Sequence, residues 1–256
     1  MKYARIIVPA SPMRRKSRHQ SEMTSQLLFG EAVKIIKEKK NGWIKLKSLH
    51  DNYEGWISTA LALQEVTEDD AKTPAACYTS GMLSSIRMNG ELLQVPLASA
   101  LPHWQEGKGR IGELVYETEG PVEQAATFEA DENKMRQYFI QWLNAPYQWG
   151  GRTILGVDCS GFVQVNFRRL GISLPRDAWQ QAQEGDTVEK LKQATCGNLA
   201  FFDDKDEIVH VGILLDSEHI IHASGKVRID KIDKKGIINS TTGKRTHSLR
   251  VIRKLW

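Results

Sequence analysis

Cysteine is scarce in this chain of 256 residues, where only Cys77, Cys159 and Cys196 occur. An odd number of cysteines at scattered positions, without a Cys-x-x-Cys pair, excludes a disulfide framework and fits a reducing compartment. No window approaches the roughly 20 apolar residues that a membrane-spanning helix needs. The first ten residues also contain too short an apolar run for a signal peptide. We therefore expect a cytoplasmic protein without a membrane span.

Long blocks of one charge sign are missing as well, although the formal net charge is +4. Lysine and arginine alternate with aspartate and glutamate, and we interpret the one basic cluster, residues 14–19, as a solvated loop. This pattern excludes a nucleic-acid-binding face and remains compatible with acidic substrates. The apolar fraction of 41% suffices for hydrophobic cores, and the length suits two or three domains.

The first 66 residues show short strand patterns separated by turns. Trp43 and Trp56 are expected in the core of a small β-barrel, with Asn41-Gly42 as a hairpin turn. A polar loop up to Ser25 and a linker over residues 64–75 are also expected. Residues 75–118 indicate a second, degenerate barrel, and an acidic connector follows over 117–132. The expected strands of the first barrel are 5–8, 26–29, 32–37, 42–46 and 55–57.

The last part of the chain changes from helical to strand patterns. Residues 135–143 have helical spacing, and another helix is expected to begin at Cys159 and to end before Gly171. A short helix is expected near 174–181. Helices followed by an antiparallel sheet predict an α+β domain. The expected strands are 199–202, 208–215, 220–223, 227–229 and 249–252.

Cys159 lies at the expected start of a helix, directly after Asp158. Unpaired backbone N–H groups and the helix dipole favour an anion there, so the thiol is expected to ionise more readily than a free cysteine, whose pKa is about 8.5. A thiolate is a nucleophile. The alternative is that Cys159 is a small buried apolar residue.

His210 and His222 lie in two expected strands, and a hairpin around residues 216–218 would bring them to adjacent positions. A neutral imidazole can take the thiol proton and return it to a leaving amine, and His222 can fix the tautomer of His210. For each histidine alone, the alternative is a buried ring that bonds a backbone carbonyl. The remaining histidines are interpreted as surface residues: His19, His50, His103, His219 and His247.

Five motifs, in this order, resemble the NlpC/P60 family of cell-wall cysteine peptidases. The front half resembles a bacterial SH3 (SH3b) domain in Gly42-Trp43-Ile44-Lys45 and Tyr53-Glu54-Gly55-Trp56-Ile57. This resemblance implies an α+β, papain-like catalytic domain over 130–256, preceded by SH3b-like barrels over 1–66 and 75–118. The five motifs are Tyr147-x-Trp149-Gly150-Gly151, Asp158-Cys159-Ser160-Gly161-Phe162, Leu174-Pro175-Arg176-Asp177, His210-Val211-Gly212-Ile213 and Ile221-His222-Ala223-Ser224.

The resemblance implies hydrolysis, without a metal or cofactor, of the bond between γ-D-glutamate and an L-diamino acid. The substrate would be a murein peptide, L-Ala-γ-D-Glu-diamino acid, in which the diamino acid is meso-diaminopimelate or lysine, and the role would be murein recycling. By motif, Cys159 is the nucleophile, His210 the base and acid, His222 the orienting residue, and Tyr147 a donor near the oxyanion. Ala178 departs from the serine often found there. The residues implied at the substrate subsites are Asp158, Ser160, Asp177, Trp149 and Arg176.

Some family members close one end of the cleft with the first barrel and admit only peptides with a free N-terminal L-Ala. Glu22 and Tyr53 are the candidates for that wall, since a carboxylate pairs with an ammonium group and a phenol can cap it. Both also fit ordinary loop or turn positions. Other functions stay open: an amidase or acyltransferase, a peptidoglycan-binding protein with an inert rear domain, or a zinc site formed by Cys159, His210 and His222. The sequence leaves the oligomeric state open.

Overall fold

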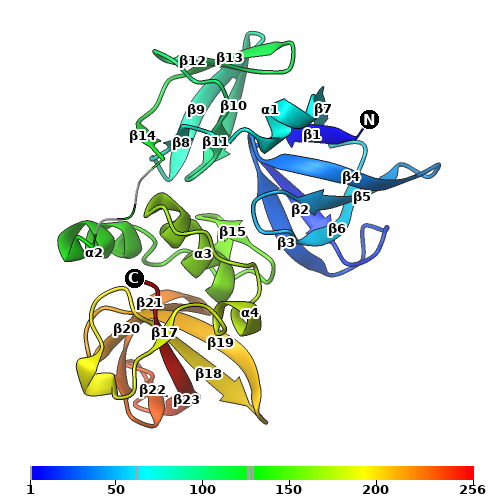
Figure 1. Ribbon diagram of the computed structural model, residues 1–256. Helices are drawn as coiled ribbons and strands as arrows, with labels where there is room; N and C mark the ends of the chain where they lie inside the picture. Colours follow the sequence, from blue (N-terminus) through cyan, green and yellow to red (C-terminus); the bar gives the residue numbers. More distant parts are fainter. Residues whose placement is uncertain (1, 62, 126–127, 129) are drawn as a thin grey trace. The chain divides into compact units, whose positions relative to one another are not determined.

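The computed structural model describes residues 2–61, 63–125, 128 and 130–256, and the chain divides into two compact units (Figure 1). Unit 1 consists of Met1–Thr127 and Trp149–Ile154. Unit 2 consists of Phe128–Gln148 and Leu155–Trp256. The chain therefore leaves unit 2 for six residues shortly before Cys159 and then returns.

The first part of unit 1 is a sheet of seven strands in the order β3-β2-β6-β5-β4-β1-β7. Its core is aliphatic and contains Ile6, Leu27 and Leu46. Trp43 is buried, as expected, whereas Trp56 is partly exposed and its ring lies 4.4 Å from the Lys39 ammonium group. The strands are β1 (Tyr3–Ile6), β2 (Ala10–Arg14), β3 (Met23–Leu28), β4 (Ala32–Lys39), β5 (Trp43–Ser48), β6 (Glu54–Ser58) and β7 (Leu63–Val66).

Two expectations about this part of the chain are wrong. The expected polar loop before Ser25 contains β2, which pairs with β3. The expected linker over 64–75 contains β7, which pairs with β1, and helix α1 (Glu68–Lys72). The Thr67 side chain caps this helix by accepting a hydrogen bond from the Asp70 N–H. The segment interpreted as a linker therefore contains a local sequence signal for a helix start.

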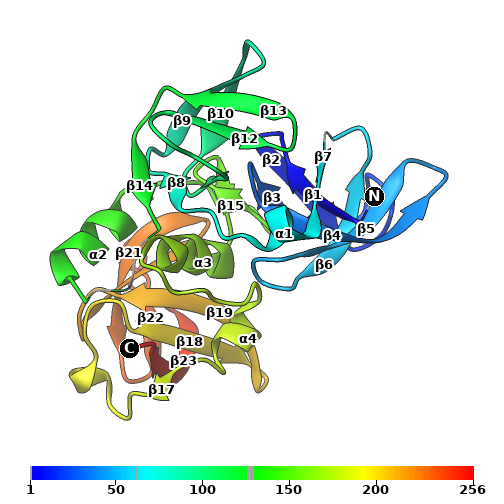
Figure 2. The ribbon, with the colours of Figure 1, turned by 45° about the horizontal axis from the view of Figure 1, so that its top comes forward.

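The second part of unit 1 consists of two small sheets, with strand orders β10-β9-β13-β12 and β11-β8-β14 (Figure 2). Their core contains Cys77, Ile86 and Tyr116 together with Phe29, which follows β3. The expected acidic connector contains β14, so that expectation is also wrong. The second SH3b-like domain and the boundaries proposed for it stay predictions. The strands are β8 (Cys77–Thr79), β9 (Leu83–Met88), β10 (Glu91–Pro96), β11 (Ala100–Leu101), β12 (Lys108–Ile111), β13 (Leu114–Thr118) and β14 (Val122–Gln124).

Unit 2 is built around an antiparallel sheet in the order β17-β23-β18-β19-β20-β21-β22, and β22 also pairs with β23. This additional pairing closes six of the strands into a barrel with an apolar interior that includes Phe202, Leu214 and Ile252. Strand β22 lies outside the expected strands. The strands are β17 (Asp186–Thr187), β18 (Leu199–Asp204), β19 (Glu207–Leu214), β20 (His219–Ser224), β21 (Lys226–Asp233), β22 (Gly236–Ile238) and β23 (Arg245–Lys254).

The helices of unit 2 are α2 (Glu132–Ile140), α3 (Cys159–Arg169) and α4 (Ala178–Gln181), with a 3-10 turn at Leu191–Gln193. Helix α3 packs against β19 and β20, and α4 packs against β19 (Figure 1). Because α3 is buried on nearly all sides, its start is fixed firmly relative to the sheet. The short strands β15 (Arg152–Thr153) and β16 (Gly156–Val157) precede it. Among the described residues, no helix has the length and apolar character to cross a membrane.

Candidate active site

Cys159 is the first residue of α3, as predicted, and only 6% of it is exposed. Asp158 is the N-cap, and its carboxylate accepts a hydrogen bond of 2.7 Å from the Gly161 N–H. The backbone N–H groups of Val211 and Ser160 donate toward the Cys159 sulfur. The first of these belongs to β19, so the thiol lies beside the strand that carries His210.

Burial raises the pKa of the Cys159 thiol to about 12, and the neighbouring Asp158 carboxylate adds to the rise. The Val211 N–H, the Arg176 guanidinium and the Ser160 N–H lower the pKa, but by less than burial raises it. The expectation that the helix start makes this thiol ionise more readily is therefore wrong. The sulfur keeps its proton at neutral pH and needs a base to remove it.

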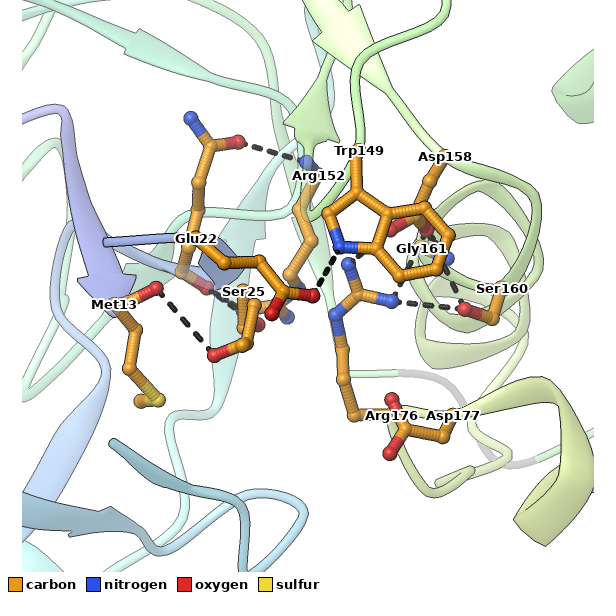
Figure 3. A network of polar contacts seen from close by, with 12 residues as sticks. Met13, Glu22, Ser25, Trp149, Arg152, Asp158, Ser160, Gly161, Arg176 and Asp177 are labelled. Atoms are coloured by element: carbon orange, nitrogen blue, oxygen red, sulfur yellow. Dashed lines mark hydrogen bonds and ion pairs between the residues drawn. The ribbon is translucent and has the colours of Figure 1, made fainter. Parts of the chain in front are cut away.

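A buried network of charged and polar side chains holds the start of α3. The Arg176 guanidinium donates to both carboxylate oxygens of Asp158, at 3.0 and 2.6 Å, and to Ser160 Oγ at 2.8 Å. Figure 3 shows these side chains facing one another. Such a two-bond ion pair is rigid as well as strong. Asp158, Ser160 and Arg176 thus fix the helix start, and their expected contact with substrate stays a prediction.

His210 and His222 lie on the neighbouring strands β19 and β20, which form the expected hairpin. The two rings are hydrogen-bonded, with 2.9 Å between His210 Nε2 and His222 Nδ1. This bond confirms the adjacency predicted from the sequence. Burial, followed by the nearness of two further protonatable rings, His222 and His247, lowers the pKa of His210 well below its usual 6.5, so His210 is a neutral ring that can accept a proton.

Two residues of the site were missed in the sequence. Asp230 on β21 lies 3.1 Å from His222 Nε2, and 1% of its side chain is exposed. His247 on β23, interpreted as a surface residue, stacks on His210 with 4.2 Å between ring centroids and 25° between planes. The interpretation of His247 is therefore wrong. Only the hairpin register of β20 and β21 and the pairing of β23 with its neighbours bring these side chains to the site.

Tyr147 lies partly buried near the thiol. Burial raises the pKa of its hydroxyl, and the neighbouring Cys159 and Asp158 add to the rise, so the phenol stays protonated and able to donate. Asp177 is the N-cap of α4, and its N–H donates to Gln180 Oε1 at 3.2 Å. The expected contact of Asp177 with substrate stays a prediction.

The remaining predicted residues belong to unit 1. Trp149 is 60% exposed, and its indole N–H donates to Glu22 Oε1 at 2.9 Å (Figure 3). Glu22 also pairs with Arg15 at 3.0 Å. Tyr53 packs its ring against the core of the first sheet. A wall at the substrate cleft formed by Glu22 and Tyr53 stays a prediction.

The segment 149–154 is held by the first sheet of unit 1. The Arg152 guanidinium donates to both carboxylate oxygens of Glu31 at 3.0 Å, and both side chains are 1% exposed. Arg152 also donates its backbone N–H to Gln26 Oε1 at 2.7 Å. Gly150 has φ of +76°, and a Cβ there would lie 2.5 Å from the Met23 carbonyl oxygen. This part of the motif region therefore folds with the first sheet.

The arrangement of the two histidines bears on the zinc alternative. Their facing nitrogens, His210 Nε2 and His222 Nδ1, bond each other, and His222 Nε2 faces Asp230. Within the described ranges, no group of three or more His, Cys, Asp or Glu side chains is arranged to hold a metal ion. The geometry favours a chain of hydrogen bonds that orients His210.

Two family models match the chain: the NlpC/P60 family over residues 144–246, and the bacterial dipeptidyl-peptidase Sh3 domain over residues 13–60. The gamma-D-glutamyl-L-lysine dipeptidyl-peptidase of Bacillus subtilis (strain 168) is 30% identical over 218 residues, which are 78% of this chain and 71% of that relative. The chain belongs to the NlpC/P60 family. It combines the family's peptidase domain with a bacterial SH3 domain.

Other proteins match in part or over the whole fold. The murein DD-endopeptidase MepS/murein LD-carboxypeptidase of Escherichia coli (strain K12) is 36% identical over 93 residues, and the chain spans about half (49%) of its length. The crystal structure of an NlpC/P60 family protein from Bacillus cereus ATCC 10987 has a TM-score of 0.80 at 19% identity and covers 99% of both chains. The latter shows that the overall fold is shared.

Proposed function

We propose that this NlpC/P60 protein is a cysteine peptidase that hydrolyses the bond between γ-D-glutamate and an L-diamino acid in murein peptides. Membership of the family and the name of the Bacillus subtilis relative, a gamma-D-glutamyl-L-lysine dipeptidyl-peptidase, support this reaction class. The observation that carries it is the hydrogen-bonded pair His210–His222 on the strand pair beside Cys159. Murein recycling in the cytoplasm is the expected setting and stays a prediction.

The reaction proceeds in two halves. Cys159 Sγ attacks the γ-carbonyl carbon of D-glutamate while its proton moves to His210, which burial keeps neutral. The tetrahedral intermediate collapses, the C–N bond breaks, and His210 gives the proton to the amine of the diamino acid. Water then attacks the thioester with His210 as the base, and the proton returns to the sulfur. The net change is addition of one water across one amide bond.

Tyr147 is proposed to stabilise the negative oxygen of each tetrahedral intermediate. Its hydroxyl is protonated because its pKa is raised by burial and by the nearby Cys159. A protonated phenol donates a hydrogen bond to an oxyanion, and one such donor contributes about 10²- to 10³-fold to the rate. The Cys159 N–H, at the first position of α3, is the second proposed donor.

On the substrate side, we propose that the enzyme takes peptides with a free N-terminal L-Ala. Glu22 and Tyr53 are the proposed wall that meets the ammonium group. Glu22 bonds Trp149 and Arg15, so its carboxylate is already oriented by two neighbours. The relative's name favours L-lysine as the diamino acid, and meso-diaminopimelate is the alternative to be tested.

The experiment is a cleavage assay on defined tri- and tetrapeptides, L-Ala-γ-D-Glu-Lys and its diaminopimelate counterpart, each free and N-acetylated, with products identified by mass. We expect release of L-Ala-γ-D-Glu from the free peptides and loss of activity in Cys159→Ala. Glu22→Ala should reduce the preference for the free over the acetylated peptide. An unchanged preference would place the wall elsewhere, and cleavage of neither peptide by the wild-type chain would refute the proposed reaction.

The same assay separates the remaining alternatives. Activity that survives a chelator but is lost after thiol alkylation supports the cysteine mechanism over a zinc site. Faster turnover of an acyl ester with an amine acceptor than of the γ-glutamyl peptide would support an acyltransferase instead. Binding of peptidoglycan without any product would support an inert rear domain.

A further inference from the structure

Asp230 is buried in unit 2 and contacts the His222 ring on the side away from His210. It lies on β21, in the hairpin that pairs β20 with β21, and its side chain and that of His222 are each 1% exposed. Asp230 Oδ2 is 3.1 Å from His222 Nε2. Asp230 Oδ1 accepts the Ser240 N–H at 2.8 Å and an Arg228 N–H at 3.0 Å. The carboxylate is therefore surrounded by donors.

Those donors keep Asp230 ionised. Burial alone raises the pKa of a carboxyl group, but the hydrogen bonds from His222, Ser240 and Arg228 outweigh burial and lower the pKa of Asp230. An ionised carboxylate has no proton and accepts hydrogen bonds only. The nitrogen of His222 that faces it must therefore carry a hydrogen.

The hydrogen on His222 Nε2 determines which nitrogens donate and accept in the rest of the hydrogen-bonded chain. A neutral imidazole carries one N–H, so a hydrogen on His222 Nε2 leaves His222 Nδ1 as an acceptor. His222 Nδ1 is 2.9 Å from His210 Nε2, which must then be the donor. His210 Nδ1 is left with a free electron pair. With one hydrogen on each imidazole, each step follows from the one before.

We propose that Asp230 is a positioning residue that fixes the tautomers of both histidines and so makes His210 Nδ1 the nitrogen that takes the Cys159 proton. This inference rests on the proposed peptidase function for its catalytic meaning, but the tautomers themselves do not depend on it. His222 orients His210 through the hydrogen bond between its Nδ1 and His210 Nε2. Asp230 supplies the negative charge that stabilises His210 when it becomes an imidazolium ion.

The substitution Asp230→Asn tests the inference with little change of shape. Arg228 faces both oxygens, with 3.0 Å from Nη2 to Oδ1 and 2.9 Å from Nε to Oδ2, so it does not select between them. The Ser240 N–H needs an acceptor at Oδ1, which places the amide oxygen there and the amide NH2 group toward His222 Nε2. Both histidines must then move their hydrogen to Nδ1, and His210 loses its basic nitrogen. We expect kcat/KM on the murein tripeptide to fall by about 10²- to 10⁴-fold, the range that general-base catalysis contributes.

The direct readout is ¹⁵N NMR of the histidine ring nitrogens in the full chain at pH 8, with signals assigned from His210→Gln and His222→Gln. In the wild-type chain we expect the Nε2–H tautomer for both rings, and in Asp230→Asn the Nδ1–H tautomer for both. An Nδ1–H tautomer on either ring of the wild-type chain would overturn the inference, and this measurement needs no variant of Asp230.

Asp216→Asn is the matched control. Asp216 also faces a histidine, with 3.0 Å to His219 Nδ1, but 46% of its side chain is exposed and it lies outside the site. The control should change neither kcat/KM nor the tautomers of His210 and His222. Full activity of Asp230→Asn despite switched tautomers would overturn the role of Nδ1. If the wild-type chain cleaves no murein peptide, the tautomers still decide the inference, so its failure is distinct from that of the proposed function.

Discussion

The stacked ring of His247 covers one face of His210, the proposed base. Phe202 contacts both rings, with centroid distances of 5.8 Å to His210 and 5.9 Å to His247. Stacking of this kind contributes about 0.5–1.5 kcal/mol and holds the plane of a ring. His247 thus limits rotation of His210 away from its partner His222.

Two substitutions of His247 distinguish the stacking of its ring from any role of its ring nitrogens. We expect His247→Ala to lower kcat/KM by about 3- to 10-fold, the equivalent of one lost aromatic contact. His247→Phe should retain activity within about twofold, because a ring that cannot titrate still stacks. Steady-state kinetics of both variants on the tripeptide at pH 8 check this. An equal loss in both would assign His247 a role through its nitrogens instead.

At the scale of secondary structure, helix α3 was the element most accessible from the sequence. Its start, cap and end are local signals: Asp158 before Cys159, and Gly171 after the last turn. Strand β2 was missed because it is five residues long and has Pro12 at its centre, a poor strand signal. Strand β7 (Leu63–Val66) was missed because it exists through pairing with the distant strand β1 (Tyr3–Ile6).

The contrast between local sequence signals and pairing of distant strands also explains which site residues were predictable. Cys159, His210 and His222 stand in short motifs whose residue types point to their chemistry. Asp230 and His247 contact the site only through strand register, 8 and 25 residues beyond His222 in the sequence. The thiol pKa was predicted with the wrong sign because burial, a property of the folded chain, outweighs the helix start.

The ion pair of Arg152 with Glu31 is the main anchor of segment 149–154. Removing one partner leaves the other charge buried, which costs about 3–5 kcal/mol. We therefore expect Glu31→Gln to lower the free energy of unfolding of unit 1 by that amount, measured by urea denaturation. Glu54→Gln, which removes the exposed partner of Lys45, is the control and should cost less than about 1 kcal/mol. Equal effects would show that the buried pair contributes no more than an exposed one.

At the scale of the molecule, the closure of the unit 2 barrel concentrates histidines in a buried region. Burial, followed by the nearness of the protonatable His222 ring, lowers the pKa of His247 to about 4, and the pKa of His210 also lies below 6.5. The unfolded chain binds protons near pH 6.5, where the folded chain does not. The contribution of these two histidines to the free energy of unfolding is therefore fully present above pH 6.5 and is lost as the pH falls from 6.5 toward 4.

The lowered pKa values of His210 and His247 predict that unit 2 loses stability in acid. Hydrogen exchange in peptides from β18 to β21 should show lower protection free energies at pH 5 than at pH 7.5, after correction for the intrinsic exchange rates. His247→Phe should show a smaller decrease, because one of the titrating groups is gone. Protection that stays constant or rises on acidification would contradict the assigned direction of the pKa shifts.

The six residues of segment 149–154 also bear on how such proteins can be rearranged. They lie within the range of the peptidase family model, yet their bonds run to Glu22, Gln26 and Glu31 of the SH3-type sheet. The SH3 domain therefore cannot be exchanged for another SH3 domain without regard to these contacts. A graft of another SH3 domain onto this peptidase would have to bring matching side chains at those three positions, or leave a buried guanidinium without its carboxylate.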